Sequence, residues 1–289
     1  MVVLKVNPME QPGSLPSTSS QVAPLLRFKN VTVSFNDRPA LIDVSFELPA
    51  GETRVVFGAA GSGKTVLLKT AIGLIRPDAG QLYLFGQNIT TLREEDQYAW
   101  RQRVGVLFQE GGLFDSLTVE ENVAYPLLYQ RERKPAPSEV EAQVKEALTF
   151  VDLAQTMEKY PAELSGGMRR RVGIARAAVS KPPLMLYDSP TAGLDPITAY
   201  HIMVLLIRQR DTRNATSIAV TYRHQDGHLM ANYIYDIPTG KLQRSDKARK
   251  QTKFLILKQG RLIFEGSESE LQSSTDPYVA KFARKKTRS

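Results

Sequence analysis

A glycine-rich segment at residues 58–65, GAAGSGKT, constrains the fold of this chain more than any other feature. A β-branched run precedes it and a helical pattern that ends near Gly73 follows it, so the local order is strand, loop and helix. Glycines let successive backbone N–H groups turn inward, and the positive end of the following helix points at the same place. The segment therefore predicts a phosphate-binding loop rather than a glycine-rich turn with an incidental lysine.

The spacing within this loop assigns roles to its side chains. Lys64 is expected to reach the terminal phosphates of a nucleotide, and the Thr65 hydroxyl is expected to ligate Mg²⁺. The predicted nucleotide contacts of the loop are Gly58, Ala59, Ala60, Gly61, Ser62, Gly63, Lys64, Thr65 and Val66.

Two further segments supply groups that such a site needs. The run LMLYD ends at Asp188, the carboxylate expected behind the phosphates and Mg²⁺. The segment LSGGM places Ser165, Gly166 and Gly167 ahead of a basic helix, where free N–H groups suit another anion. A head-to-tail dimer would explain two anion-binding turns in one chain, because each nucleotide would lie between the loop of one subunit and the Ser165 turn of the other.

Hydrophobic patterning divides the chain into parts. Residues 1–24 are rich in Ser, Pro and Gln and are expected to be disordered. Alternating apolar and polar residues then predict two antiparallel strands around a turn at residues 36–39. The other expected parts are an α/β core over 25–90 and 181–270, a helical subdomain over 91–180, a basic surface insertion over 236–253, and a C-terminal helix and basic tail over 271–289.

One helix of the expected helical subdomain has a clear pattern. Ser138 and Glu141 form a capping-box signature at its start. Its apolar face is predicted to consist of Val140, Val144, Leu148 and Val151.

Composition limits the classes of protein. The 289 residues contain no cysteine, which excludes a disulfide scaffold and a cysteine nucleophile. No stretch approaches the roughly 20 apolar residues of a membrane span, and no signal peptide is evident, so a soluble cytoplasmic chain is expected. The net charge of +8 suits nucleic acid, anionic lipid or solubility. Five basic residues near the end indicate a solvated tail or transient contact with an anionic membrane: Lys281, Arg284, Lys285, Lys286 and Arg288.

The order and spacing of GAAGSGKT, Gln109, LSGGM, LMLYD and GLDP resemble those of the ATP-binding subunits of ABC transporters, over about residues 25–285. The resemblance implies an α/β P-loop NTPase fold, with a RecA-like core, an antiparallel β subdomain and an inserted α-helical subdomain. It implies ATP and Mg²⁺ as cofactors, with Thr65, Gln109 and Asp188 around the metal. It also implies that Phe35 stacks on adenine, that Gln109 links Mg²⁺ to a membrane partner, and that Asp195 is the D-loop aspartate.

Residues 106–127 further resemble the Q-loop region of Mla-type and Mce-type lipid transporters. This resemblance implies an MlaE-like permease that docks at the Q-loop region, an MCE-type substrate-binding protein, and a homodimer of ATPase subunits at the cytoplasmic face of the inner membrane. ATP binding would close the dimer, hydrolysis would reopen it, and phospholipid or another hydrophobic molecule would move. The residues themselves indicate only that an apolar loop follows Gln109, and no nucleic acid partner is expected.

The chain departs from the family pattern at two catalytic positions. Ser189 stands where relatives carry a glutamate, and a hydroxyl is no equivalent base near neutral pH. Tyr222 stands at the switch histidine, while His224 lies two places on, on the other side if the strand continues.

Three interpretations of these departures stay open. Hydrolysis is slow and depends on Lys64, Mg²⁺ and the Ser165 turn; a carboxylate such as Glu110 or a partner's residue substitutes; or the chain is a clamp that binds ATP without cleaving it. A soluble ABC ATPase acting on nucleic acid is the competing class of protein. The residues assigned to catalysis are Lys64, Gln109, Asp188, Ser189, Tyr222 and His224.

Overall fold

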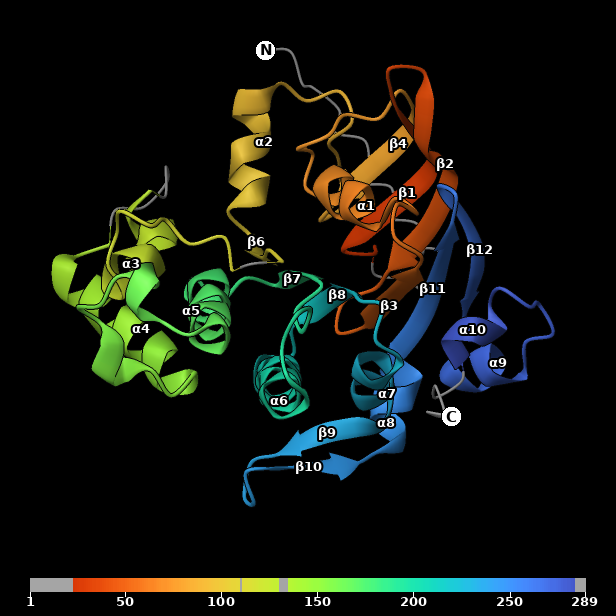
Figure 1. Ribbon diagram of the computed structural model, residues 1–289. Coiled ribbons are helices and arrows are strands. Elements are labelled where there is room, and N and C mark those ends of the chain that lie inside the picture. The colour runs from red at the N-terminus through yellow and green to blue at the C-terminus, as the bar shows by residue number, and fades with distance from the viewer. Residues whose placement is uncertain (1–22, 110, 130–134, 284–289) are drawn as a thin grey trace, which may run out of the picture.

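The computed structural model describes residues 23–109, 111–129 and 135–283. A six-stranded sheet in the order β12-β11-β3-β8-β7-β6 forms the centre of the molecule (Figure 1). Five of its strands run parallel and β12 pairs antiparallel with β11. The strands are β3 (Thr53–Gly58), β6 (Val104–Leu107), β7 (Leu184–Asp188), β8 (Thr216–Val220), β11 (Thr252–Lys258) and β12 (Arg261–Gly266).

The central strands are buried on both faces. Every residue of β3, β7 and β8 is buried, which is typical of parallel strands covered on both sides. Alternate residues serve different cores: Val55 and Phe57 belong to one hydrophobic cluster, while Val56 belongs to the other. The two clusters fix the sheet between helices on one face and a second sheet with helix α1 (Lys64–Ala71) on the other.

The second sheet confirms the predicted antiparallel pair of strands. Its order is β2-β1-β4-β5, with β1 (Leu26–Phe35), β2 (Arg38–Leu48), β4 (Ala79–Leu84) and β5 (Gln87–Asn88). The turn between β1 and β2 is two residues long, shorter than the four expected. Asn36 and Asp37 have φ of 47° and 62°, the left-handed pair that a tight hairpin requires.

Four helices flank one end of the central sheet: α2 (Glu94–Arg101), α3 (Val119–Leu128), α4 (Pro137–Phe150) and α5 (Gly166–Ala178), with short 3₁₀ turns η1 (Ala154–Thr156) and η2 (Pro161–Glu163). The predicted apolar face of α4 is confirmed, because its four residues Val140, Val144, Leu148 and Val151 are all buried. The predicted capping box is wrong. The helix begins at Pro137 after Ala136, and no side chain caps it, because proline already sets the backbone for a first turn.

The expectation that residues 91–180 are helical misses one strand. Val104–Leu107 form β6, which pairs in parallel with β7 and closes the edge of the central sheet. Gly105 permits this packing, since a Cβ there would lie 2.2 Å from the Ala177 carbonyl oxygen. A four-residue strand shows no period from which sequence could identify it.

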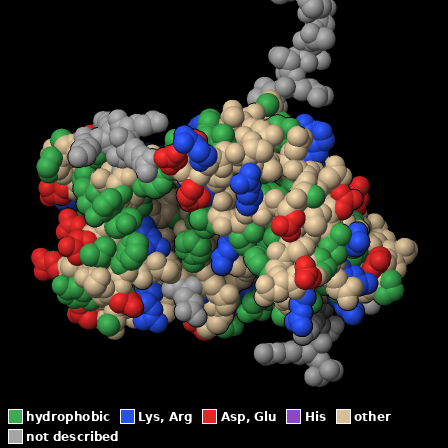
Figure 2. Space-filling view, turned by 90° about the horizontal axis from the view of Figure 1, so that it is seen from above, with side chains coloured by type: hydrophobic (Ala, Val, Ile, Leu, Met, Phe, Trp, Pro, Cys, Tyr) green, Lys and Arg blue, Asp and Glu red, His purple; other side chains and the backbone are tan. Residues whose placement is uncertain are grey.

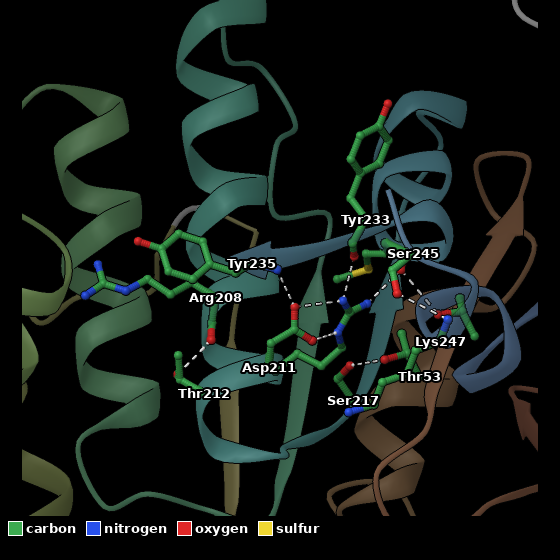
Figure 3. A network of polar contacts seen from close by, with 12 residues as sticks. Thr53, Arg208, Asp211, Thr212, Ser217, Tyr233, Tyr235, Ser245 and Lys247 are labelled. Carbon is green, nitrogen blue, oxygen red and sulfur yellow. Dashed lines mark hydrogen bonds and ion pairs between the residues drawn. The ribbon is translucent and has the colours of Figure 1, made fainter. Parts of the chain in front are cut away.

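Residues 236–253 were expected to form a turn-rich surface excursion, and they are more regular than that. They hold the end of β9 (Tyr233–Asp236), then β10 (Lys241–Arg244), α8 (Asp246–Gln251) and the start of β11. The β9–β10 hairpin follows α7 (His224–Asn232) and packs on α6 (Pro196–Arg213). The Tyr235 N–H donates to Asp211 Oδ2 at 2.7 Å, and the Arg208 guanidinium lies 5.4 Å from the Tyr235 ring (Figure 3). The hairpin is therefore anchored to the core.

The chain ends with α9 (Glu268–Ser273) and α10 (Ala280–Ala283). Most of the expected disordered start, the candidate base Glu110 and the basic residues 284–289 lie outside the described residues. Within the described ranges no helix has the length and hydrophobicity that crossing a bilayer demands.

Candidate nucleotide-binding site

The glycine-rich loop joins the carboxyl end of β3 to the amino end of α1, as the sequence predicts. Gly63 is the N-cap of α1 with φ of 101°, and a Cβ there would lie 2.4 Å from the Ala40 carbonyl oxygen. Gly61 also has a positive φ, of 73°. The glycines are thus required by backbone conformation and by close packing, and they leave backbone N–H groups at a helix start where phosphates bind.

Lys64 lies across this loop. Its ammonium group donates to the carbonyl oxygens of Gly58 and Ala59, both at 2.8 Å. Burial lowers the pKa of Lys64, and the Asp188 carboxylate opposes that shift. The lysine is therefore a partly desolvated cation held at the place where the terminal phosphates of a nucleotide would lie.

Asp188 brings the loop and β7 together. Its Oδ2 accepts a hydrogen bond from Thr65 Oγ1 at 3.0 Å, and its Oδ1 accepts one from Ser189 Oγ at 3.1 Å. Hydroxyl and carboxylate oxygens are ligands that Mg²⁺ prefers, so Thr65 and Asp188 fit the metal of a nucleotide complex. No set of three or more His, Asp or Glu side chains in the described ranges could hold a metal ion, so the nucleotide's phosphates would have to complete its shell.

Gln109 and Phe35 lie at exposed positions. Gln109 follows β6 at the same edge of the sheet, and among the described residues no hydrogen bond joins it to Thr65 or Asp188. Phe35 ends β1 with 48% of its surface exposed, so its ring is available for stacking rather than part of a core. The two predicted roles stay predictions.

The Ser165 turn lies in a different part of the molecule from the loop (Figure 1). Ser165 caps α5, with its Oγ accepting the Met168 N–H at 3.2 Å. A cavity of about 420 Å³ opens here, lined also by Gly166, Gly167 and Asp195. Asp195 caps α6 by accepting the N–H groups of Ile197 and Thr198 at 3.0 Å. The N-terminal ends of α5 and α6 thus meet at one surface, and Asp195 already accepts the N–H groups at the start of α6.

Comparison with known proteins decides the family. A family model described as "ABC transporter" matches residues 41–192, more than half of the chain. The chain belongs to the ABC transporter family. A solved dimeric ATP-binding cassette in a post-hydrolysis state, bound to ADP and phosphate, has a TM-score of 0.71 at 28% identity and covers 84% of this chain and 98% of that one. The P-loop fold of an ABC cassette is therefore confirmed.

Curated relatives of the ABC family differ in their names. A probable ribonucleotide transport ATP-binding protein, Mkl of Mycobacterium leprae, is 39% identical over 197 residues, which is 68% of this chain. This chain spans 56% of the length of that relative. The intermembrane phospholipid transport system ATP-binding protein MlaF of Haemophilus influenzae is 32% identical over 261 residues, 90% of each chain.

The two residues predicted to depart from the ABC pattern, Ser189 and Tyr222, follow the carboxyl ends of β7 and β8. Ser189 has φ of 49°, and its N–H donates to the Val220 carbonyl oxygen at 2.9 Å, which ties it to the end of β8. Tyr222 follows β8 and is 58% exposed. Among the described residues, the Ser189 hydroxyl has a hydrogen bond to the Asp188 carboxylate and to no other carboxylate. The candidate binding groups therefore lie close to the two positions at which the sequence predicts a departure from the family pattern.

His224 does not lie on a continuing strand. β8 ends at Val220 and His224 is the first residue of α7, with its ring 6.0 Å from that of His228. Its side chain therefore follows the geometry of a helix start and not the alternation of a strand.

Asp226 is a site residue that the sequence did not reveal. It is buried, and its Oδ2 accepts hydrogen bonds from Thr191 Oγ1 at 2.5 Å and Thr221 Oγ1 at 2.8 Å. Burial raises the pKa of Asp226, while the two hydroxyl groups and Arg223 oppose that shift. Asp226 thus joins the segment after β7 to the segment after β8, the two segments that carry Ser189 and Tyr222. An acidic residue one turn into the helix that follows a buried strand is the signal that could have found it.

A second concave surface lies next to Gln109. A groove of about 520 Å³ is lined by aromatic side chains, including Phe108, Phe114, Tyr125 and Tyr129. Phe114 and Tyr125 lie 4.7 Å apart, ring centre to ring centre, and Arg176 lies 5.5 Å from the Phe114 ring. Figure 2 shows hydrophobic side chains gathered over the helical lobe on the face it views. Exposed aromatic clusters of this kind are typical of protein interfaces.

Proposed function

We propose that this chain is the ATP-hydrolysing subunit of an ABC transporter that moves phospholipid or another hydrophobic molecule between envelope membranes. One observation carries the ATPase part: the Thr65 hydroxyl and the Asp188 carboxylate meet at 3.0 Å beside a loop that already holds Lys64. Bound Mg²⁺ would neutralise charge on the phosphates. Lys64 would neutralise more of it, and the loop's N–H groups would orient the phosphates for attack by water.

The working unit in this proposal is a head-to-tail homodimer. The loop and the Ser165 turn belong to different lobes, and each offers N–H groups to an anion. A nucleotide between two copies would use both, and the similar cassette was solved as a dimer with ADP and phosphate. ATP but not ADP is therefore expected to drive dimerisation, because the terminal phosphate is the group that reaches the Ser165 turn. Light scattering with each nucleotide tests this, and equal dimerisation by ADP would contradict it.

The permease is proposed to bind in the aromatic groove. Phe114 and Tyr129 are 42% and 57% exposed, which is costly for large apolar rings unless a partner covers them. The groove adjoins Gln109, so a partner helix seated there would sense the nucleotide site. Such docking would keep the chain peripheral at the cytoplasmic face of the inner membrane, next to an MlaE-like permease and an MCE protein.

The length of the match to MlaF supports phospholipid as the substrate class. That alignment covers 90% of each chain, whereas the alignment with the ribonucleotide-type relative covers 68% of this chain and 56% of the other. The substrate and the MCE partner rest on this similarity, not on chemistry within the chain.

Hydrolysis is proposed to be slow. Ser189 Oγ donates to Asp188 and cannot take a proton from water near neutral pH, so positioning and charge must supply most of the rate. Ser189 and Tyr222 together also favour a second candidate, a clamp that binds ATP without cleaving it.

Purification of the native complex with its permease tests the transporter proposal. We expect a multispanning permease to co-purify, ATP turnover to be measurable, and vesicle phospholipid to raise that turnover. Phe114→Asp should release the permease while ATP binding persists, because a charge would have to be buried in an apolar interface. Ile237→Asp, at the exposed tip of the β9–β10 hairpin, is the matched control. Recovery of nucleic acid instead of a permease would refute the proposal in favour of a soluble ATPase.

A further inference from the structure

Tyr278 contacts the phosphate loop from the far end of the chain. The Ala59 N–H donates to Tyr278 Oη at 3.1 Å across 219 residues of sequence. Tyr278 Oη in turn donates to the Leu257 carbonyl oxygen at 3.3 Å, on the strand that neighbours β3. The phenol thus bridges the loop and the sheet, and nothing in the family roles described above assigns it.

The ring of Tyr278 is held without help from its hydroxyl. Asp276 Oδ1 accepts the N–H groups of Tyr278 at 2.7 Å and Val279 at 3.0 Å, which forms a tight turn. The Tyr278 and Phe282 rings meet at 5.4 Å and 64°, and Phe282 stacks on Phe57 at 5.7 Å. Apolar contacts therefore hold the C-terminal segment on the core, and the hydroxyl makes the two hydrogen bonds that join the loop to Leu257.

Ala59 is held from two directions. Its carbonyl oxygen accepts Lys64 Nζ at 2.8 Å and the Ser62 N–H at 3.2 Å. Its N–H is directed to Tyr278, so this N–H is committed to the C-terminal segment while the carbonyl carries the lysine. The Ala59 N–H shares a peptide plane with the Gly58 carbonyl, which also accepts Lys64 Nζ, so rotation of that plane would break the contacts with both Tyr278 and Lys64. Tyr278 thus restrains the residue that holds Lys64.

We infer that Tyr278 is a positioning residue of the nucleotide site, whose hydroxyl keeps the first turn of the phosphate loop in its phosphate-binding conformation. This inference rests on the proposed function, because it requires the loop to bind a nucleotide. Loss of the hydroxyl would let the loop sample other conformations, and binding would have to restore the competent one. ATP and ADP both place phosphates in the loop, so both should be affected alike.

Tyr278→Phe tests the inference because it removes the hydroxyl and keeps the ring. With Mg²⁺ present, calorimetry should give a Kd for ATP and for ADP about fivefold higher than in the wild type, the usual effect of one hydrogen bond. The KM for ATP should rise by a similar factor while kcat changes little. Hydrogen exchange of the peptide over residues 58–65 should become faster. Tyr83→Phe, which loses a 3.0 Å hydrogen bond to Gln81 far from the loop, is the matched control and should bind like the wild type.

The outcomes separate the two proposals. If Tyr278→Phe lowers the Tm but binds both nucleotides like the wild type, Tyr278 only attaches the C-terminal segment and the inference is overturned. If the wild-type chain itself binds no nucleotide, the proposed function fails and the inference fails with it. Weaker binding in Tyr278→Phe but not in Tyr83→Phe supports both.

Discussion

Two parts of the candidate nucleotide site differ in how closely their side chains match those expected of an ABC ATPase. In the predicted binding half, Gly58 to Thr65 with Asp188, the lysine donates to two loop carbonyls at 2.8 Å and the Thr65 hydroxyl donates to the Asp188 carboxylate at 3.0 Å. The predicted cleavage half has the Ser189 hydroxyl and the exposed Tyr222 phenol at the two positions where the sequence predicts a departure from the family's carboxylate and imidazole. The contrast predicts that binding and cleavage depend on separate residues, so each half can be altered alone.

The largest effect should come from breaking the binding half. Lys64→Ala removes the cation that faces the terminal phosphates, and loss of such a group costs at least about a hundredfold in turnover. ATP binding should weaken as well, which calorimetry measures beside the turnover assay. Lys69→Ala, an exposed position on the same helix, is the control. Unchanged ATP binding and turnover in Lys64→Ala would refute the site.

Repair of the cleavage half should give the next largest effect. Ser189→Glu places a base one residue after Asp188, and general base catalysis typically contributes about a hundredfold or more. We expect turnover of the purified complex to rise by that order while the Kd for ATP stays within about twofold. Ser189→Gln has the same length without the base and should remain slow. A wild type that already matches Ser189→Glu would exclude the clamp and show that this position is not limiting.

A smaller gain should follow from the switch position. Tyr222→His in the Ser189→Glu background should raise turnover about three- to tenfold, because an imidazole can exchange a proton with the attacking water or the phosphate near neutral pH and a phenol is a poor base there. The pH profile should acquire an inflection near 6.5, the ordinary pKa of histidine. Tyr222→Phe is the control that removes the phenol without adding a base. A profile identical to that of Tyr222→Phe would mean that the position does not face the nucleotide.

The distance along the chain between contacting residues decides what the sequence could predict. The phosphate loop and Asp188 were predictable, because strand, turn and helix follow one another in one stretch of chain. The strand β6 was not predictable, because four residues show no period. Its partner strand β7 is also distant in the sequence, since the helices α3, α4 and α5 come between the two strands. Helix α4 was found from its apolar face, but its start was misplaced because Pro137 can begin a helix without a capping side chain.

Site residues supplied by distant segments escaped prediction for a similar reason. The contact of Tyr278 with Ala59 exists only because β11 pairs with β3 and the chain after β12 returns to that edge. Asp226 depends on where β8 ends and α7 begins, a boundary that the sequence placed too late. Periodicity locates elements, but which side chains meet at the edge of a sheet follows from the order of its strands.

The smallest expected effect is on the link between the two segments of the cleavage half. Asp226 has its pKa raised by burial, so the folded state binds a proton more tightly than the unfolded state does. Its contribution to stability is therefore lost as pH rises from the unfolded value of 3.8 through the folded value. Asp226→Asn keeps an oxygen acceptor for Thr191 and Thr221 but carries no charge, so that loss should vanish. In thermal unfolding, the Tm of the variant minus that of the wild type should increase, by a few degrees at most, as the pH is raised from 4 to 8.

Thr191→Val is the control, because it removes one hydrogen bond to the carboxyl group and leaves the titrating group in place. The Tm difference between Asp226→Asn and the wild type could instead be the same at every pH. That result would contradict the raised pKa, because it would mean that Arg223 and the two hydroxyl groups stabilise the buried carboxylate as well as water does in the unfolded chain.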